Sequence, residues 1–298
     1  MTTRTQPAAI RSLASLRTRV GEWRRAGERV AFVPTMGALH AGHISLVRLA
    51  AKRADRVVVS IFVNPTQFAP GEDFEAYPRD LKADRRLLAG LGVDIVYTPT
   101  DQHMYHPDHS TALRVGGVGD GLETDHRPTF FHGVALVVAK LLNRVQPDIA
   151  VFGEKDYQQL AVIRRMVRDL DMPVRIIGAP IARDDHGLAL SSRNRYFSEG
   201  GLEVARALNR IMFGTRDALQ SGAAVERTLR ESEAALVRAG LASVDYVSLT
   251  DANSLQPVTR GPIRAPARLL VAAHAPARPG QSGSPRVRLI DNCAVDPT

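Results

Sequence analysis

The sequence predicts an α/β protein: a Rossmann-like doubly wound parallel sheet, followed by a smaller C-terminal α+β domain. Two observations predict this arrangement. Up to residue 182, short β-branched runs alternate with stretches whose apolar residues recur at helical spacing, which is typical of a parallel sheet wrapped by helices. From residue 183 onward the order changes to two helical stretches followed by strand-like runs, which indicates a separate domain.

The elements of the larger domain follow one another in the order that a doubly wound sheet requires. We predict strands at residues 30–34, 57–63, 94–98, 149–152 and 174–181. We predict helices at residues 44–54, 81–91, 134–145 and 157–170. Ligands of such sheets bind at the carboxyl ends of the strands, so the residues directly after each strand are the first candidates for a site.

The second domain is predicted to span residues 183–298. We expect helices at residues 204–219 and 224–239 and strands at residues 245–250, 268–273 and 287–290. The polar, glycine-containing stretch 183–187 is suited to a hinge, so we place the domain boundary between residues 182 and 183. Residues 276–285 are rich in Pro, Gly and Ser and are expected to form a surface loop.

Composition limits the function classes. Hydrophobic residues make up 44% and charged residues 23% of the 298 residues, as in soluble globular proteins. No apolar run approaches the roughly 20 residues that span a bilayer, and residues 1–11 lack the apolar core of a signal peptide, so we expect a cytoplasmic protein. Cys293 is the only cysteine, which excludes an intrachain disulfide and a cysteine-based metal site.

The net charge of +8 allows two kinds of partner. Clustered basic residues would favour a nucleic acid, and an RNA-binding module is therefore one alternative. However, the arginines are scattered, and aromatic residues, only 5% of the chain, do not alternate with them as they would in a stacking platform. The distribution favours a small anionic substrate.

The first candidate site reads P-T-M-G-A-L-H-A-G-H at residues 34–43, where a predicted strand leads into a helix. The amides and dipole of a helix N-terminus can hold a phosphate, while Gly37 and Gly42 let a ligand approach the backbone closely. His40 and His43 share one helical face and can both donate hydrogen bonds to phosphate oxygens. Half of a metal site is the alternative, but the glutamate of the zinc-protease pattern is absent.

Two further candidate sites directly follow predicted strands. Gln67 follows the strand at 57–63 and carries both an amide donor and a carbonyl acceptor, which suits a hydroxy acid. Lys155 and Asp156 follow the strand at 149–152. A lysine is a compact charge that can track a phosphate as its negative charge grows, and the aspartate can orient a nucleotide or a cation.

The fourth candidate lies just past the predicted hinge. Ser191, Ser192 and Arg193 offer two hydroxyls and a guanidinium that can grip phosphate oxygens at two points. Such a segment, carried by a second domain, is suited to a mobile anion clamp that closes over a reactive intermediate and excludes water.

Taken together, these motifs resemble the pantothenate synthetase family of the H-x-G-H nucleotidyltransferase-like superfamily. Further matching segments are F-V-N-P-T-Q-F at 62–68, Y-P-R at 77–79, F-G-E-K-D-Y-Q-Q at 152–159, S-S-R-N-R-Y at 191–196 and, more faintly, L-I-D-N at 289–292. The resemblance implies an ATP-dependent ligase that joins pantoate to β-alanine through a pantoyl-adenylate and releases AMP and diphosphate. It also implies a homodimer.

The resemblance assigns roles to individual residues. It implies that His43, His40, Lys155 and Arg193 act in catalysis and that Gln67 and Gln159 bind pantoate. It implies nucleotide contacts from Met36, Gly37, His40, Gly42, His43, Gly153, Lys155, Asp156, Ser191, Ser192 and Arg193. Mg²⁺ is the implied metal, with Asp84 as its candidate ligand.

The chain departs from the family pattern at three positions. Ala41 replaces an acidic residue between the histidines, Phe130 replaces a histidine, and Leu190 replaces a methionine. None of these changes removes a residue with an assigned role. A nucleotidyltransferase acting on a small phosphate ester is the nearest rival, because the same H-x-G-H site serves that chemistry. Gln67 and Gln159 favour the ligase, since a phosphate acceptor would call for cations at those positions.

Overall fold

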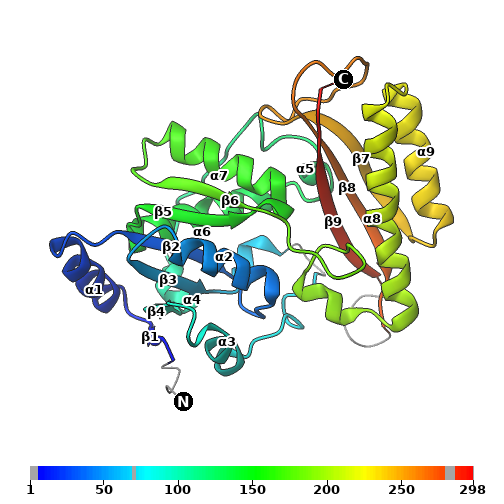
Figure 1. Cartoon of the computed structure of the whole chain (residues 1–298). Helices are drawn as coiled ribbons and strands as arrows, with labels where there is room; N and C mark the ends of the chain where they lie inside the picture. Colours follow the sequence, from blue (N-terminus) through cyan, green and yellow to red (C-terminus); the bar gives the residue numbers. More distant parts are fainter. Residues whose placement is uncertain (1–5, 69–71, 279–285, 298) are drawn as a thin grey trace.

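The computed structural model describes residues 6–68, 72–278 and 286–297, and it divides into a large α/β part and a smaller part built on a second sheet (Figure 1). Most of the predicted surface loop, residues 279–285, lies outside the described residues, and Pro276 is the last residue of a strand. Within the described ranges, no helix combines the length and the hydropathy that crossing a membrane requires.

The large sheet is parallel throughout and has the strand order β1-β4-β3-β2-β5-β6. Its strands are β1 (Ala8–Ile10), β2 (Val30–Thr35), β3 (Arg56–Ile61), β4 (Ile95–Tyr97), β5 (Ile149–Gly153) and β6 (Arg175–Ala179). The helices around it are α1 (Leu13–Arg25), α2 (Ala41–Ala51), α3 (Leu81–Leu88), α4 (Asp101–Met104), α5 (Glu123–His126), α6 (Phe130–Val145) and α7 (Tyr157–Asp169). The predicted doubly wound fold is confirmed.

Alternation along the strands explains the two helical layers. In β2, Val30 and Phe32 pack into a core with α1, α6 and α7, whereas Ala31 and Val33 pack on the opposite face with α2 and α3. Successive strand residues point to opposite faces, and both faces are covered, so the buried centres of the strands, such as residues 30–33 and 57–59, are apolar at consecutive positions rather than at every second one.

The smaller part is an antiparallel sheet with the order β7-β8-β9, formed by β7 (Ser243–Asp251), β8 (Ala267–Pro276) and β9 (Arg286–Val295). Helices α8 (Glu199–Gln220) and α9 (Val225–Arg238) cover the face of this sheet that is turned away from the large sheet (Figure 1). Buried residues of α8, α9 and the three strands form one core. The predicted α+β character of this part is confirmed.

Several element boundaries differ from the prediction. The strand expected at 57–63 ends at Ile61, and a short 3-10 helix, η1 (Pro65–Gln67), begins at the proline. Helix α6 begins four residues before the expected start, at Phe130. Strand β1 and helix α1 were not predicted: β1 has only three residues, and the apolar stripe Leu16, Val20 and Trp23 of α1 is separated by polar and basic residues.

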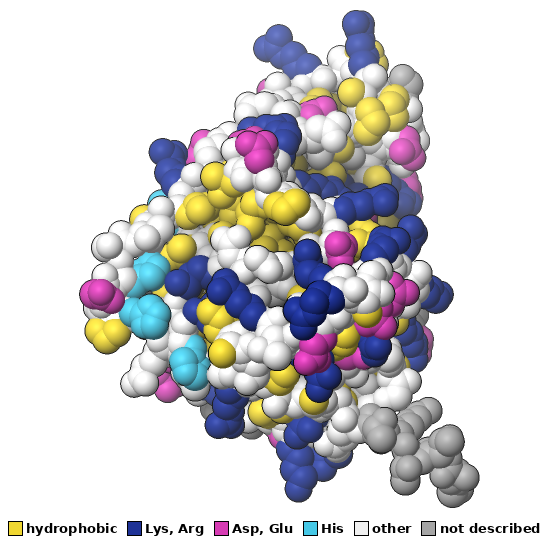
Figure 2. Space-filling view, turned by 90° about the vertical axis from the view of Figure 1, so that its left-hand side faces the viewer, with side chains coloured by type: hydrophobic (Ala, Val, Ile, Leu, Met, Phe, Trp, Pro, Cys, Tyr) yellow, Lys and Arg dark blue, Asp and Glu magenta, His cyan; other side chains and the backbone are white. Residues whose placement is uncertain are grey.

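The proposed boundary between residues 182 and 183 lies between the two sets of core residues. The cores of the large sheet extend to Ala179, and the core of the small sheet begins at Leu188. Leu255, which follows β7, is the exception, since it packs into the first core. On the face shown in Figure 2, Lys and Arg side chains are spread over the surface, with Asp and Glu side chains among them.

Candidate active site

A cavity of about 460 Å³ lies between the two sheets, at the carboxyl ends of β2, β3, β5 and β6. It brings together the predicted motifs from distant parts of the sequence. All but two of the predicted site residues line it: Met36, His40, Gly42, His43, Gln67, Gly153, Lys155, Asp156, Gln159, Ser191, Ser192 and Arg193. Gly37 and Asp84 are not among the lining residues.

Gly37 and Asp84 shape the loop between β2 and α2 instead. Gly37 and Ala38 both have left-handed backbone conformations, with φ of 83° and 50°. The two carboxylate oxygens of Asp84, which is 3% exposed, accept hydrogen bonds from the amides of Ala38 (3.1 Å) and Leu39 (2.8 Å). A β-carbon at Gly37 would lie 3.0 Å from Asp84 Oδ2, so glycine allows this close approach. Asp84 is thus placed to stabilise the loop.

The two histidines cap helix α2 reciprocally. His40 Nδ1 accepts a hydrogen bond from the amide of Gly42 (3.1 Å), and His43 Nδ1 accepts one from the amide of His40 (3.3 Å). Because an amide donates to each Nδ1, a neutral ring carries its proton on Nε2. The backbone therefore sets the tautomer of both rings and leaves each Nε2–H as a donor for a ligand.

Both rings are held in the neutral form. Burial, together with the positive charges of Lys155 and Arg195, lowers the pKa of His40 to about 4. Burial, the neighbouring His40 and Lys155 lower the pKa of His43 to about 3. The two rings lie 4.1 Å apart, centroid to centroid, so a proton on one disfavours a proton on the other. At neutral pH the pair consists of two neutral donors.

The amide of Gln67 has a fixed orientation. Its Oε1 accepts a hydrogen bond from Asn64 Nδ2 (3.0 Å), and Asn64 Oδ1 in turn accepts one from Tyr105 Oη (2.8 Å). The Nε2 group of Gln67 is therefore directed to the cavity as a donor. Helix α6 packs directly under this turn, because a β-carbon at Gly133 would lie 2.3 Å from the carbonyl oxygen of Thr66.

Lys155 and Asp156 lie on η2 (Glu154–Asp156), a 3-10 turn between β5 and α7. Their charged groups are 3.7 Å apart. Gln159 lies in the first turn of α7 and lines the cavity. Its neighbour Gln158 is buried and binds other parts of the protein: Oε1 accepts from the amide of Glu123 (3.1 Å), and Nε2 donates to two carbonyl groups. Gln158 thus supports the fold, and Gln159 is the glutamine better placed to bind a ligand.

The segment Ser191–Arg193 contacts the part of the chain that carries the large sheet. Ser192 donates its hydroxyl hydrogen to the carbonyl of Ala38 (3.2 Å), which places the segment against the loop of the first motif. Arg193 is paired with Asp73 through Nε (3.0 Å) and Nη2 (2.6 Å). Two side chains of the segment thus attach it to the large α/β part.

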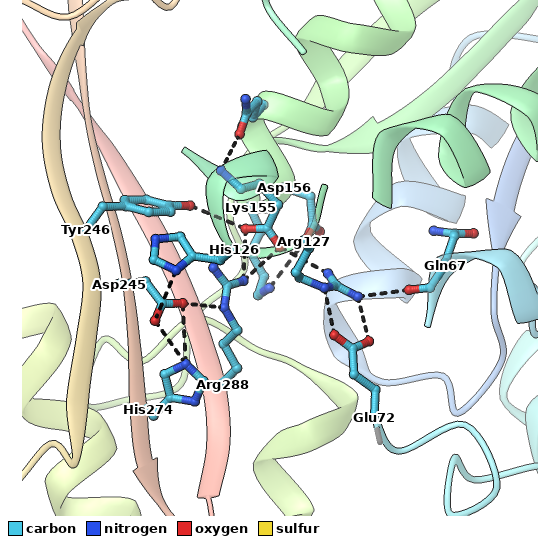
Figure 3. Close-up of polar contacts among 12 residues, drawn as sticks. Gln67, Glu72, His126, Arg127, Lys155, Asp156, Asp245, Tyr246, His274 and Arg288 are labelled. Carbon is cyan, nitrogen blue, oxygen red and sulfur yellow. Dashed lines mark hydrogen bonds and ion pairs between the residues drawn. The ribbon is translucent and has the colours of Figure 1, made fainter. Parts of the chain in front are cut away.

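Arg127 joins the turn that carries Gln67 to a group of carboxylates (Figure 3). It donates to both oxygens of Glu72 (2.8 and 2.7 Å), to Glu123 (3.0 Å) and to the carbonyl of Gln67 (2.8 Å). Its guanidinium lies 3.8 Å from the centre of the Phe130 ring. Phe130, where the family has a histidine, therefore provides a stacking surface for this arginine without adding a titratable group.

Arg288, on β9 of the small sheet, binds Glu123 of α5 at the same point (Figure 3). Its Nη1 lies 2.8 Å from both oxygens of Glu123, which is 5% exposed, and its Nε donates to Asp245 (2.7 Å). Although burial opposes ionisation, hydrogen bonds from His274 and Arg288 lower the pKa of Asp245 to about 2. Asp245 is thus charged and paired at neutral pH.

Sequence reasoning missed this second set of residues. Asp73, Glu123 and Arg288 line the cavity but carry no recognisable local motif. The only signals were their positions: Asp73 comes shortly before the Y-P-R segment, and Glu123 comes seven residues before Phe130, one of the departures from the family pattern. Their contacts could not be inferred without the fold.

Comparison with known proteins agrees with this geometry. Residues 8–294 match the family described as pantoate-beta-alanine ligase. The pantothenate synthetase of Mesorhizobium japonicum is 52% identical over 290 residues, which cover 97% of this chain and 98% of that protein. The pantothenate synthetase of Caulobacter vibrioides is 51% identical over 292 residues, 98% of this chain and 99% of that protein.

Comparison with solved structures supports the same family assignment. A pantothenate synthetase from Thermus thermophilus superposes with a TM-score of 0.87 at 43% identity, covering 97% of this chain and 100% of that one. A pantoate-beta-alanine ligase from Francisella tularensis, complexed with β-γ ATP and β-alanine, superposes with a TM-score of 0.77 at 31% identity, covering 96% of this chain and 97% of that one. By its motifs, its fold and these relatives, the chain belongs to the pantoate-beta-alanine ligase family.

Proposed function

We propose that this chain joins pantoate to β-alanine in two steps within the cavity between its sheets. In the first step, a pantoate carboxylate oxygen attacks the α-phosphorus of ATP, the bond to the β-phosphate breaks, and diphosphate leaves. In the second step, the amine of β-alanine attacks the acyl carbon, the bond to AMP breaks, and the ammonium proton is lost. The products are pantothenate, AMP and diphosphate.

The observation that carries this proposal is that one cavity is lined by two kinds of polar group. The first kind is suited to phosphate: the Nε2–H donors of His40 and His43 and the ammonium group of Lys155. The second kind consists of the neutral amides of Gln67 and Gln159. The first group suits the triphosphate, and the second suits the hydroxyls and carboxylate of pantoate.

The two glutamines support the ligase over the phosphate-ester rival. Gln67 and Gln159 present neutral amides, and Arg127 and Arg288, which also line the cavity, are each bound to two carboxylates. A phosphate ester would bring a doubly charged group and would call for additional cations in place of the neutral amides. Pantoate, with one carboxylate and two hydroxyls, makes no such demand.

The assigned groups act by position and charge. The backbone fixes the tautomers of His40 and His43, so both are ready donors as negative charge grows on the phosphate oxygens, and Lys155 adds a positive charge. We propose that Arg193, Ser191 and Ser192 grip the leaving diphosphate and that Met36, Gly42, Gly153 and Asp156 form the remaining nucleotide contacts, while Gly37 shapes the loop that carries Met36. No side chain needs to form a covalent bond with the substrate.

A protein-held magnesium ion finds little support in the side chains. Among the described residues, no group of three or more His, Cys, Asp or Glu is arranged to hold a metal ion, and Asp84 directs its oxygens to two amides. We therefore derive no step through a metal bound by the protein, and Mg²⁺ enters this proposal only as the partner of ATP.

The domain roles, assembly and location complete the proposal. Residues 1–182 bind ATP and pantoate, and residues 183–298 act as a lid that carries the phosphate clamp. The family resemblance supports a homodimer in the cytoplasm.

The adenylate step can be tested separately from ligation. With ATP, magnesium and pantoate but without β-alanine, the enzyme should exchange labelled diphosphate into ATP, because adenylate formation is reversible. Adding β-alanine should then release AMP and the amide. Exchange that requires β-alanine, or that proceeds with a phosphate ester in place of pantoate, would replace the ligase with the rival nucleotidyltransferase.

A further inference from the structure

The turn that carries Lys155 belongs to the large domain by sequence but is held by the small one. Asn292, on β9, donates two hydrogen bonds from its side-chain Nδ2: one to the carbonyl of Glu154 (3.0 Å) and one to the carbonyl of Lys155 (2.8 Å). Asn292 is 1% exposed. Both hydrogens of its amide group are therefore committed to the backbone of this one turn.

Neighbouring residues fix the orientation of that amide. Arg268 Nε donates to Asn292 Oδ1 (2.7 Å), while the guanidinium of Arg268 lies 4.3 Å from the centre of the Tyr157 ring. Exchanging the oxygen and nitrogen of the amide would place the oxygen against two carbonyl oxygens and its NH₂ group against Arg268. The observed orientation is therefore the one that satisfies every partner.

The backbone at Asn292 is equally constrained. Its amide donates to Asp291 Oδ1 (2.7 Å), and Asp291 forms a two-point pair with Arg183 (2.6 and 2.9 Å), the residue at the proposed hinge. Tyr157, which follows the turn, donates its hydroxyl hydrogen to the carbonyl of Ala252 in the small domain (2.8 Å). The Lys155 turn is thus attached to the second domain on two sides.

Core packing alone does not account for this arrangement. An apolar residue would fill a buried position of β9 without the cost of desolvating an amide. The asparagine instead directs two donors at consecutive carbonyls, which fixes the height and tilt of the turn and hence the starting point of the long Lys155 side chain. A misplacement of about 1 Å at such a group can cost roughly a hundredfold in rate.

We infer that Asn292 is a positioning residue for Lys155: it joins the β-sheet of the second domain to the phosphate-binding turn, so that the lysine is correctly placed only while the two domains are docked. This inference rests on the proposed function, because it takes Lys155 as a phosphate-binding group. The polar atoms of the Asn292 side chain are all engaged within the protein, so its effect on a substrate is indirect.

A double-mutant cycle tests the inference on the full-length protein. Diphosphate exchange with ATP and pantoate is measured for the wild type, Asn292→Ala, Lys155→Ala and the double variant. We expect Asn292→Ala to reduce kcat/KM for ATP roughly ten- to a hundredfold while changing the pantoate KM less than about twofold. In the Lys155→Ala background the same substitution should cost less than about threefold.

Controls separate positioning from folding. Asn292→Asp has nearly the same volume and keeps a partner for Arg268 but loses both donors, so it should lose exchange even where Asn292→Ala fails to fold. Asn253→Ala, on an exposed turn, should match the wild type. Equal losses with and without Lys155, or full activity in a folded Asn292→Asp variant, would overturn the inference. A Lys155→Ala variant with wild-type exchange would instead refute the phosphate-binding role proposed for Lys155, and exchange that requires β-alanine in the wild type would refute the proposed function.

Discussion

Arg193 holds Asp73 through two of its three guanidinium nitrogens, Nε and Nη2, in a pair that connects the clamp segment to the loop before Tyr77. The third nitrogen, Nη1, is not part of this pair. The guanidinium can therefore keep its carboxylate partner and still present a donor edge to a phosphate. Asp73 therefore orients the guanidinium group of Arg193.

Replacing Asp73 with asparagine should make the orientation of the Arg193 side chain less fixed. We expect Asp73→Asn to raise the KM for ATP about three- to tenfold with kcat nearly unchanged, because the charge-assisted bonds are lost while the shape is kept. Initial rates over a range of ATP concentrations measure the effect. Asp169→Asn, which removes the partner of the exposed Arg168, should change nothing. A lower KM for ATP in Asp73→Asn would mean that the carboxylate competes with the nucleotide.

His43→Ala should fold normally and lose about a hundredfold or more in the rate of diphosphate exchange, the scale of removing one transition-state donor. His40→Ala should behave similarly. Circular dichroism checks the fold, and the exchange assay measures the loss. Wild-type exchange by folded His43→Ala would contradict the phosphate role of that ring.

Stability below neutral pH should depend on the same two rings. In the unfolded chain they bind protons near the ordinary pKa of 6.5, whereas in the folded chain His40 and His43 bind them only near 4 and 3. Between these values the unfolded state binds more protons, so their contribution to stability is complete above pH 6.5 and is lost as the pH falls toward 4 and 3.

This loss can be measured by urea unfolding from pH 6.5 down to pH 4, the interval between the ordinary pKa and that of folded His40. The free energy of unfolding of the wild type should fall more steeply with decreasing pH than that of His43→Gln, which has no proton to gain. Parallel pH profiles for the two proteins would show that His43 titrates normally in the folded state.

Gln67→Ala should act on the acid rather than on the nucleotide. We expect the pantoate KM to rise roughly tenfold or more, since a hydrogen bond of about 1–2 kcal/mol is lost, while the KM for ATP stays within about twofold. The matched control is Gln256→Ala, whose side chain lies on an exposed turn. An unchanged pantoate KM in Gln67→Ala would contradict the assignment.

Glu123→Gln should destabilise the junction between the domains. The substitution removes the charge between the partly buried Arg288 and Arg127, each of which keeps a second carboxylate partner, so we expect a loss of about 1–3 kcal/mol, below the cost of leaving a buried charge without any partner. Urea unfolding measures the loss. Glu226→Gln removes a similar carboxylate from the exposed pair with Arg230, where about 0.5 kcal/mol or less is expected. Equal effects in the two variants would show that Glu123 is not a structural link.

The fold could be predicted where a short stretch of sequence carries the signal for a helix or strand. The inner strands of the parallel sheet are buried on both faces, so β2, β3 and β5 appear in the sequence as continuous apolar runs. Strand β1 carries no such signal, since it has three residues and pairs only with β4 at the edge of the described sheet. Its existence depends on a partner that lies far along the chain.

The same distinction applies to the site. The H-x-G-H loop, the Lys155 turn and the Ser191–Arg193 segment are each encoded within a few residues, and the sequence identifies them. Their supports are distant: Asp73 meets Arg193 across 120 residues, Glu123 meets Arg288 across 165, and Asn292 meets Lys155 across 137. Acidic and amide residues of this kind are common on any surface, and only the folded chain shows which of them are paired.

Gly133 sets a limit on how this enzyme can be altered. Helix α6 touches the Thr66 carbonyl backbone to backbone, and Asn64 Nδ2 donates to the carbonyl of Gly133 (3.3 Å). The distance between α6 and the turn that carries Gln67 is therefore set by two main chains in contact, with no side chain between them. A larger residue at position 133 would push the helix and the turn apart and displace Gln67 with the turn.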